Sequence, residues 1–287
     1  MRVAVTGGAG FIGRHVIAQL EKRGISPTLV SRPGSPIPAG VPGSRVVSMD
    51  IADAPPDAYD QLGRPDVLIH LAWGGLPNYA SPHHLDDELP AHRAFLEGLL
   101  NGGLGGLSVA GSCLEYGLQS GALSEKMPTA PVTAYGKAKD ALRVDLERLH
   151  EGRPFNLTWG RIFYLYGDGQ APGSLIPQLE AAIARGDAAF NMSGGEQLRD
   201  YLPVETAAGY LADLALNGQD NGIVNVCSGR PISVRELAEG VVAKHASPIS
   251  LNLGHFPYAD YEPMAFWGDR RKLDRCLEQS DEAVGPR

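Results

Sequence analysis

The sequence contains little cysteine, no excess of positive charge and no long hydrophobic run. Its three cysteines, Cys113, Cys227 and Cys276, are odd in number and far apart. They predict neither a disulfide framework nor a metal site, and they fit a reducing compartment. Lysine and arginine number 25 against 33 acidic residues, which gives a formal net charge of −8. This balance argues against nucleic acid or an anionic membrane surface as a partner.

Two further absences concern targeting. No stretch is apolar and long enough to cross a bilayer, and the chain enters an expected strand at once, without a signal peptide. We therefore expect a cytoplasmic protein with no membrane partner. Glycine (36 residues) and proline (22) are frequent in the 287 residues and show no repeat period, which indicates many tight loops.

The N-terminal segment carries the strongest positive signal. Residues 1–6 are apolar and rich in β-branched side chains, and they break into a glycine-rich turn that precedes an amphipathic helix over 12–23. A buried strand that turns through glycines into a helix forms the dinucleotide site of parallel α/β sheets, because the free N–H groups of the helix face the phosphates. The cofactor-binding residues predicted here are Gly7, Gly10, Phe11, Ile12 and Gly13.

The next two expected strands suggest which cofactor binds. An NAD-selective site usually has an acid near the end of the second strand, whereas this chain has Ser31 and Arg32 there. Since arginine pairs with phosphate oxygens in a fork, this pattern favours NADP(H), although NAD(H) and a merely solvated arginine remain alternatives. Asp50, followed by Ile51, ends the third strand and is predicted either to hold the adenine amino group or to cap a turn.

The alternation of strands and helices predicts an α/β fold. We expect a Rossmann-type, doubly wound parallel sheet over residues 1–165 and a smaller C-terminal α/β substrate-binding region over 166–287. Elements at about 204–226 are expected to pack back on the first domain. The polar residues after Asp274 are expected to be disordered. His70 is predicted to be a hydrogen-bonded core histidine, and the pair His83-His84 to lie on the surface.

A candidate catalytic group lies in the helix expected over 134–150. Tyr135 and Lys139 are four residues apart and therefore share a helix face. A free tyrosine has a pKa of about 10, and a neighbouring ammonium and a cationic nicotinamide would favour its phenolate. Ser112, at the end of an expected strand, is placed to hold a substrate oxygen. The alternative is a surface helix with an unremarkable tyrosine and lysine.

These motifs, in this order, resemble the extended short-chain dehydrogenase/reductases, which include nucleotide-sugar epimerases, dehydratases and reductases. The matching segments are 6–13, 50–51, 70–72, 112–117, Tyr135 with Lys139, 161–167, 195–204 and 228–233. The resemblance implies that Ser112 holds the sugar oxygen, Tyr135 transfers the proton and Lys139 binds the nicotinamide ribose. It further implies cofactor contacts from Leu71, Ala72 and Phe163, and substrate contacts from Trp73, Cys113, Leu114, Tyr164 and Arg199. Phe190 is also expected to shape the pocket.

Departures from the family pattern narrow the chemistry. The 4,6-dehydratases carry an Asp-Glu pair directly after the position of Ser112, where this chain has Cys113 and Leu114, and Glu115 comes one residue too late. Dehydration is therefore not expected. Tyr164 replaces the family's asparagine, and Glu262 with Pro263 replaces an expected second arginine.

Two reactions then fit. One is NADPH-dependent reduction of a nucleotide-linked 4-keto-6-deoxy sugar for surface polysaccharides, which the Ser31-Arg32 pair favours. The other is 4-epimerisation with tightly bound NAD. A third possibility, of another class, is a non-catalytic NADP-binding sensor or scaffold, which typically loses the tyrosine or the lysine. The resemblance also implies a homodimer, formed through the helices expected over 85–100 and 134–150.

Overall fold

The main body of the molecule is a seven-stranded sheet. The computed structural model describes residues 1–34 and 44–284, with the backbone alone described for 280–284. All neighbouring strands of this sheet are parallel, in the order β11-β7-β5-β4-β1-β2-β3. The strands are β1 (Val3–Thr6), β2 (Thr28–Ser31), β3 (Arg45–Ser48), β4 (Val67–His70), β5 (Gly106–Ser112), β7 (Asn156–Ile162) and β11 (Gly222–Val226).

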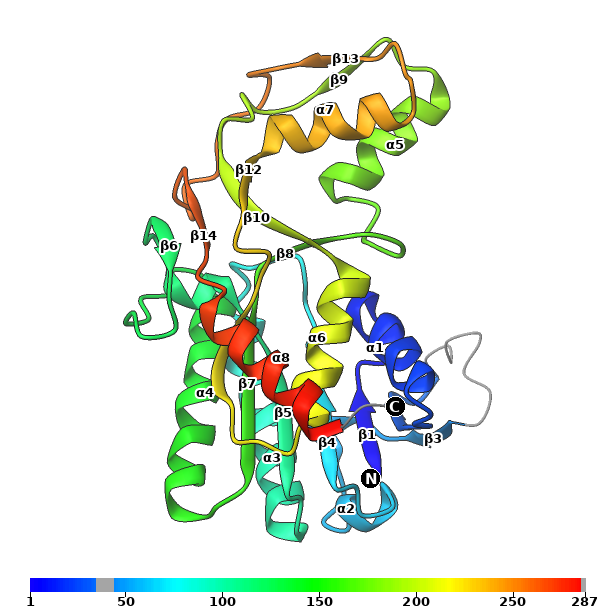
Figure 1. Cartoon of the computed structure of the whole chain (residues 1–287), viewed down its shortest axis with the longest axis vertical. Coiled ribbons are helices and arrows are strands. Elements are labelled where there is room, and N and C mark those ends of the chain that lie inside the picture. Colours follow the sequence, from blue (N-terminus) through cyan, green and yellow to red (C-terminus); the bar gives the residue numbers. More distant parts are fainter. Residues whose placement is uncertain (35–43, 285–287) are drawn as a thin grey trace.

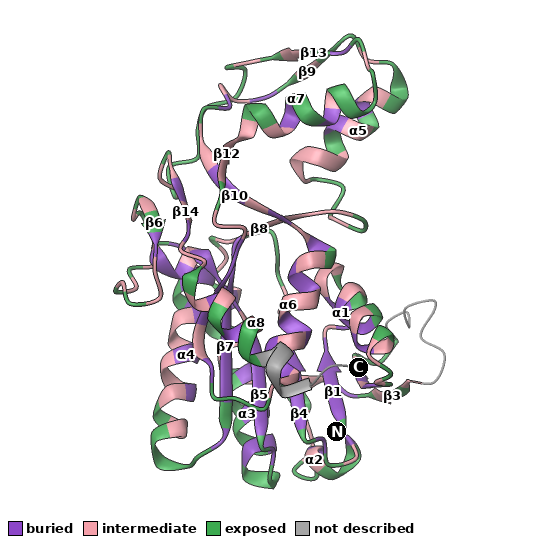
Figure 2. Ribbon diagram, in the orientation of Figure 1, coloured by how far each residue is buried: buried purple, intermediate pink, exposed green. Residues whose placement is uncertain are grey.

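Helices cover both faces of this sheet (Figure 1). One face carries α1 (Phe11–Lys22), α6 (Val204–Leu216) and α8 (Arg271–Val284), and the other carries α2 (Ala58–Gln61), α3 (Leu89–Gly102) and α4 (Ala134–Gly152). Central strands such as β4 are buried along their whole length (Figure 2), as expected for strands covered on both faces. Strand order reverses between β1 and β4, so the predicted Rossmann-type, doubly wound fold is confirmed.

A smaller region stands above the carboxyl ends of the strands. It contains the helices α5 (Leu175–Arg185) and α7 (Val234–Lys244), which share an apolar core. Its short strands are β8 (Tyr164–Tyr166), β9 (Ala189–Asn191), β10 (Leu198–Pro203), β12 (Pro231–Ser233) and β13 (Ser250–Asn252). β14 (Phe266–Gly268) pairs with β6 (Gly121–Leu123) at the side.

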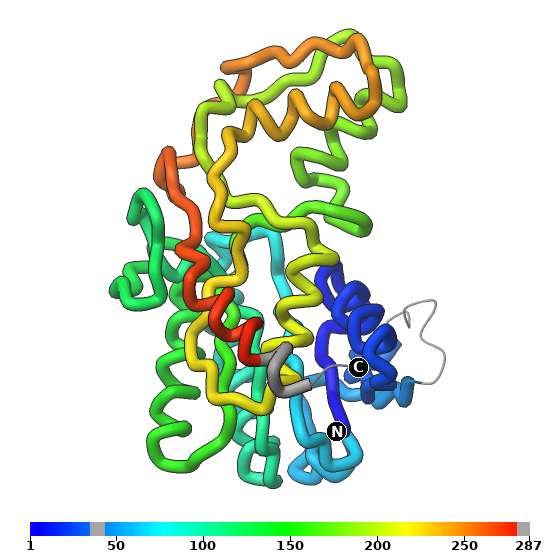
Figure 3. The backbone as a smooth tube through the Cα atoms, viewed as in Figure 1, coloured from blue at the N-terminus to red at the C-terminus, as the bar shows by residue number. Residues whose placement is uncertain are grey.

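The chain crosses between the two regions several times (Figure 3). It leaves the sheet after β7, returns for α6 and β11, crosses again for β12 and α7, and comes back through β14 for α8. On its return, α6 packs on α1, and β11 adds an edge strand beside β7. The junction of the two regions is therefore made by several separate segments of the chain.

The helix expected over 85–100 is present as two parts: His84–Glu88 form a π-helical turn, and the regular helix α3 continues from Leu89 with Pro90 in its first turn. The expectation of disorder after Asp274 is wrong as far as Val284, where α8 ends, and residues 285–287 lie outside the described part of the chain. In α8, Leu273 and Cys276 are buried against the core that includes α6. Two apolar residues at helical spacing in an otherwise polar segment are too few to predict a helix from the sequence.

All three cysteines are buried, and none forms a disulfide within the described chain. Over residues 1–34 and 44–284, no helix combines the length and the apolar character needed to cross a bilayer.

Candidate active site

The glycine-rich turn after β1 is closely packed. Gly7 has a φ of +70°, and a Cβ there would stand 2.6 Å from the backbone nitrogen of Ala72. A Cβ on Gly13 would overlap the carbonyl oxygen of Gly7 and stand 2.7 Å from the Cα of Gly8. Both positions therefore require glycine, the first to make the turn and the second to bring α1 against β1.

The start of α1 fits a dinucleotide phosphate. Gly10 precedes the helix, no side chain caps its first N–H groups, and no acidic residue lies in its first turn. A Cβ on Gly10 would meet only the carbonyl oxygen of Gly7 within 4 Å, so its outer side is open to a ligand. Unpaired N–H groups at the positive end of a helix dipole are suited to phosphate. The residues present therefore fit the cofactor that the motif implies.

The adenosine side of the expected site lies at the ends of β2 and β3. Arg32 is exposed directly after β2, and the N–H of Met49 donates to the carbonyl oxygen of Ser31 (2.8 Å). Asp50 accepts a hydrogen bond from Ala52 N (3.0 Å) and caps the turn Ile51–Asp53. Asp50 thus fills the turn-capping role, one of the two expected, and its contact with adenine stays a prediction.

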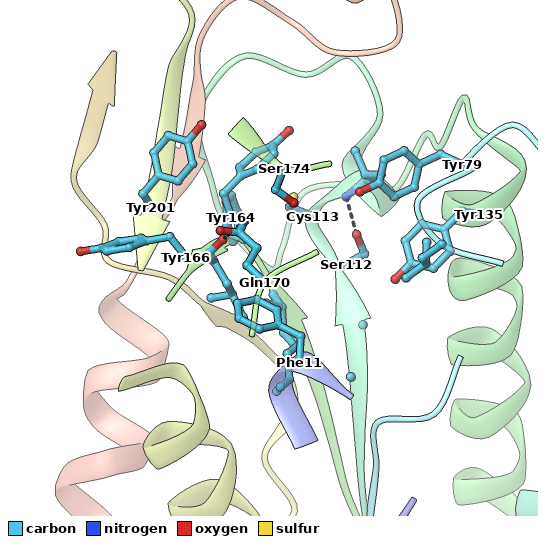
Figure 4. Close-up of a pocket in the computed structure, with 18 of the residues that line it drawn as sticks. Phe11, Tyr79, Ser112, Cys113, Tyr135, Tyr164, Tyr166, Gln170, Ser174 and Tyr201 are labelled. Atoms are coloured by element: carbon cyan, nitrogen blue, oxygen red, sulfur yellow. Dashed lines mark hydrogen bonds between the residues drawn. The ribbon is translucent and has the colours of Figure 1, made fainter. Parts of the chain in front are cut away.

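Ser112, Tyr135 and Lys139 meet at one cavity of about 560 Å³ beneath the smaller region. Figure 4 shows Ser112, Tyr135 and Tyr79 on one side of this cavity, opposite Tyr164, Tyr166 and Tyr201. Many of the predicted cofactor and substrate residues also line it: Phe11, Ile12, Leu71, Trp73, Cys113, Leu114, Phe163 and Tyr164. The cavity thus joins the start of α1 to the end of β5.

Other predicted residues lie away from the cavity wall. Gly7, Gly10 and Gly13 form the turn described above, Ala72 packs against it, and Ser31, Arg32, Asp50 and Ile51 lie at the ends of the next two strands. Phe190 does not line the cavity. It belongs to β9 and packs into the core of the smaller region with α5 and α7, so its expected role in the pocket is wrong.

Glu115 points away from the cavity and holds the serine turn from behind. Its carboxylate is fully buried and accepts hydrogen bonds from Ser112 N (2.8 Å), Trp159 Nε1 (3.0 Å) and Arg161 Nε (2.7 Å). The Ser112 hydroxyl in turn accepts a bond from Leu114 N (3.2 Å). Sequence reasoning noticed Glu115 only as a displaced dehydratase acid and missed this role, although Arg161 lies within a segment matching the family.

Burial dominates the electrostatics of the tyrosine and the lysine. It raises the pKa of Tyr135, nearby Tyr79 adds to the rise, and a hydrogen bond with Ser112 opposes it. Burial also lowers the pKa of Lys139 to about 7, against the attraction of Glu115 and Glu88. The expectation that Lys139 and a bound nicotinamide together favour the phenolate stays a prediction. The Lys139 Nζ donates to Ala110 O (2.9 Å) and lies 5.9 Å from the centre of the Tyr135 ring.

The histidines behave differently from one another. His70 is fully buried and bonds to Thr6 Oγ1 (2.8 Å) and His92 Nδ1 (2.7 Å), so the prediction of a core histidine is confirmed. His83 lies partly exposed at the surface, and its Nδ1 pairs with Asp87 (2.7 Å). His84 is fully buried, so the prediction of a surface position is wrong for this residue. It bonds to the Trp73 indole, a contact that depends on tertiary packing and leaves no pattern in the sequence.

Residues 3–227 of the sequence match the family model of the NAD dependent epimerase/dehydratase family. The chain belongs to this family. It is an NAD(P)-dependent oxidoreductase or epimerase of the extended short-chain dehydrogenase/reductase type, and the predicted resemblance is confirmed.

Two proteins that are similar to this family member are both named as dTDP-6-deoxy-L-talose 4-dehydrogenases. The dTDP-6-deoxy-L-talose 4-dehydrogenase (NAD(+)) of Aggregatibacter actinomycetemcomitans is 29% identical over 93% of this chain and 99% of that protein. The dTDP-6-deoxy-L-talose 4-dehydrogenase (NAD(P)(+)) of Kitasatospora kifunensis is 28% identical over 87% of this chain and 81% of that protein.

Solved structures agree on the fold. MoeE5 in complex with UDP-glucuronic acid and NAD superposes with a TM-score of 0.80 and 25% identity, and the match covers 97% of this chain and 93% of that one. A UDP-glucose-4-epimerase of Stenotrophomonas maltophila superposes with a TM-score of 0.85 at 21% identity, over 99% and 96% of the two chains. The second likeness supports the fold alone.

The far end of the cavity in this family member carries an unusual ion pair. Arg199, in β10, is buried over the ring of Phe266 (4.6 Å to its centre), and its Nη2 donates to Glu262 Oε2 (3.0 Å). The Tyr164 hydroxyl donates to the same carboxylate. Glu262 lines the cavity and Arg199 lies behind it, so the contact of Arg199 with substrate stays a prediction.

Proposed function

We propose that this enzyme transfers a hydride at C4 of a nucleotide-linked 6-deoxyhexose, working as an NADPH-dependent reductase of the 4-keto sugar. The observation that carries the proposal is the convergence of Ser112, Tyr135 and Lys139 on one cavity. The two residues that follow Ser112, Cys113 and Leu114, supply no carboxyl group to it. Without an acid and base there to eliminate water, oxidation and reduction at one carbon is the simplest chemistry that the site supports. The named activities of the two relatives support the same carbon and sugar class.

The chain's own residues would orient the ketone and protonate it. Ser112 Oγ would hold the carbonyl oxygen, and the Tyr135 hydroxyl would donate its proton to that oxygen as it gains negative charge. A phenol whose pKa is raised by burial keeps its proton and suits this donating role. The nicotinamide, when bound, supplies the hydride to C4, and Lys139 would hold its ribose. The product is the alcohol, and solvent returns a proton to Tyr135.

The proposed preference for NADPH depends on Arg32. This guanidinium is exposed at the end of β2, at the edge of the sheet shared with the glycine-rich turn. Within residues 1–34 and 44–284 it has no hydrogen bond or ion pair, and such a guanidinium can pair with a 2′-phosphate in a fork. The two relatives are named for NAD(+) and for NAD(P)(+), so they support a nicotinamide cofactor without choosing between them.

The direct test supplies a dTDP-linked 4-keto-6-deoxyhexose with NADPH or NADH and follows loss of the reduced nicotinamide. We expect consumption of one NADPH per sugar reduced, and Tyr135→Phe should abolish turnover while cofactor binding persists. Interconversion of C4 epimers with retained NAD and no net consumption would contradict the proposal in favour of a 4-epimerase. Full cofactor binding without any turnover on such sugars would contradict it in favour of a sensor or scaffold.

We also propose that the enzyme is a cytoplasmic homodimer. Helices α3 and α4 pack side by side on one face of the sheet (Figure 1), and such a pair can form a four-helix interface with a second copy. Light scattering at micromolar concentration should give twice the mass of the 30.5 kDa chain. A monomer alone would contradict this part of the proposal.

A further inference from the structure

Trp73 lies between helix α4, which carries Tyr135 and Lys139, and the buried His92. One face of its indole meets Lys139, whose Nζ is 3.8 Å from the ring centre, and the Tyr135 ring approaches at 5.9 Å and 78°. The indole also stacks on His92, with ring centres 4.4 Å apart and planes 17° apart. Trp73 therefore contacts both groups assigned to proton transfer and cofactor binding.

The indole is fixed at its N–H as well as at its faces. Trp73 Nε1 donates to His84 Nδ1 (3.1 Å), and His84 Nε2 bonds to the carbonyl oxygen of Asn78 (2.8 Å). The same loop is joined to the catalytic helix, since Tyr135 N donates to Tyr79 O (3.0 Å). The loop and the helix therefore hold each other in register.

A carboxylate anchors the histidine behind the indole. Glu88 Oε2 accepts from Gly74 N (2.6 Å) and bonds to His92 Nε2 (3.0 Å), while His92 Nδ1 bonds to His70. A Cβ on Gly74 would stand 2.5 Å from Glu88 Oε1, so a glycine directly after Trp73 allows this close approach. The result is a continuous support that runs from Glu88 through His92 and Trp73 to Lys139.

We propose that Trp73 is a positioning residue that holds the Lys139 ammonium at the cavity wall, with His92 and His84 fixing its ring. An ammonium over an indole face is attracted by the ring quadrupole, and the attraction is strongest where water is excluded. Lys139 is only 2% exposed, and its hydrogen bond to Ala110 O leaves one side of the ammonium for the indole. This inference rests on the proposed role of Lys139 in binding the nicotinamide ribose.

Several charged or titratable groups surround the ammonium besides the indole. The carboxylates of Glu115 and Glu88 favour its charge, and burial opposes it, which leaves the pKa of Lys139 at about 7. The charge on Lys139 in turn contributes to the lowered pKa values of His70 and His92, for which burial is the larger cause. The indole adds a stabilisation of the charged form to this balance.

The experiment measures binding of NADPH and of NADH by calorimetry across pH, for wild type and for Trp73→Met and Trp73→Phe. Methionine fills much of the space without an aromatic face, whereas phenylalanine keeps a face and loses the N–H. Loss of a desolvated cation–π contact should lower the pKa of Lys139 by about 1.5 units, a roughly 30-fold change in its protonation equilibrium. Binding that depends on the ammonium should then weaken at lower pH in Trp73→Met than in wild type, and Trp73→Phe should shift less than half as far.

Controls separate positioning from folding. Trp267→Met replaces an indole in β14 that does not line the cavity, and it should leave the pH profile unchanged. His92→Leu removes the ring behind Trp73 and should move the profile in the same direction, by less. Circular dichroism establishes that each variant is folded, and a variant that does not fold is replaced in the comparison by His92→Leu.

The inference is overturned if folded Trp73→Met, or folded His92→Leu in its place, binds both nucleotides with the wild-type pH profile. It is also overturned if Trp73→Met raises only the KM for the sugar, because Trp73 would then act as a substrate contact. Neither readout of nucleotide binding requires a sugar. Failure of the proposed reaction would instead appear as a wild-type enzyme without turnover whose binding profile still shifts in Trp73→Met.

Discussion

Removing Arg161 should destabilise the protein by leaving the buried Glu115 carboxyl group without its counter-charge. The two side chains are 1% and 0% exposed, and Arg161 Nε lies 2.7 Å from Glu115 Oε2. Breaking such a pair from one side costs about 3–5 kcal/mol. In Arg161→Met the carboxylate keeps its bonds from Ser112 N and Trp159 Nε1, so we expect a loss near the lower end, about 3 kcal/mol.

The loss should depend on pH in a defined direction. Burial already raises the pKa of Glu115 in the folded protein, and Arg161 is the largest influence that lowers it. Without the arginine the folded pKa rises further above the unfolded value of about 4.3. The folded variant then binds more protons than the unfolded chain, so its free energy of unfolding falls as pH rises, by up to about 1.4 kcal/mol per pH unit. The window runs from the unfolded pKa to the raised folded pKa.

Urea unfolding followed by circular dichroism at several pH values measures both quantities. The matched control is Glu115→Leu with Arg161→Met, which replaces both charges by apolar groups. We expect this double variant to be close to wild type in stability and to lose the pH slope. The turnover of the double variant should be lower than that of wild type, because Ser112 N has lost its acceptor on Glu115. An Arg161→Met loss below about 1 kcal/mol, or a slope equal to that of the double variant, would refute the reasoning.

Three further predictions concern other parts of the site. Gly13→Ala places a Cβ against the Gly7 carbonyl and should lower the free energy of unfolding by about 1–3 kcal/mol. Calorimetry should also show a more than tenfold loss of NADPH affinity. In the control Gly98→Ala a Cβ meets nothing within 4 Å, so neither quantity should change. Burial works to raise the pKa of Glu88, but bonds from His92 and the Gly74 N–H lower it to about 2. The stabilisation by Glu88 is therefore fully present above its unfolded pKa of about 4.3 and is lost as pH falls toward 2. Glu88→Gln should remove this loss of thermal stability at acid pH. Arg32→Ala should weaken binding of NADPH and leave NADH unchanged, and an equal loss for both would contradict the assignment of the 2′-phosphate.

Local patterns were sufficient for much of the fold. The strand, glycine turn and helix at residues 3–22 were predictable because each residue obeys a local rule of conformation or periodicity. Helices α1 (Phe11–Lys22) and α4 (Ala134–Gly152) lie close to the ranges expected for them, 12–23 and 134–150. The spacing of Tyr135 and Lys139 also placed them correctly on one buried helix face at the cavity.

The remaining features depend on contacts between distant segments. Nothing local distinguishes His84, which is fully buried and bonded to the Trp73 indole, from His83, which is partly exposed. The spacing of Tyr135 and Lys139 indicates a nearby ammonium, but it does not reveal the burial that raises the pKa of the Tyr135 phenol. Glu115 was recognised as displaced from a catalytic position, while its true partner lies 46 residues away on the neighbouring strand.

The two buried polar clusters of the site share one arrangement, and it explains why local rules fail there. Behind Ser112, at the ends of β5 and β7, lies the pair of Glu115 and Arg161; behind Trp73, at the end of β4, lie His92 and Glu88. Buried charges and imidazoles are costly unless fully bonded, and an apolar core would be easier to build. Each cluster stands directly behind a residue of the cavity wall and fixes it by a bond or a stacked ring. In both clusters, residues that depart from simple patterning therefore support the part of the cavity wall to which the proposal assigns the reaction.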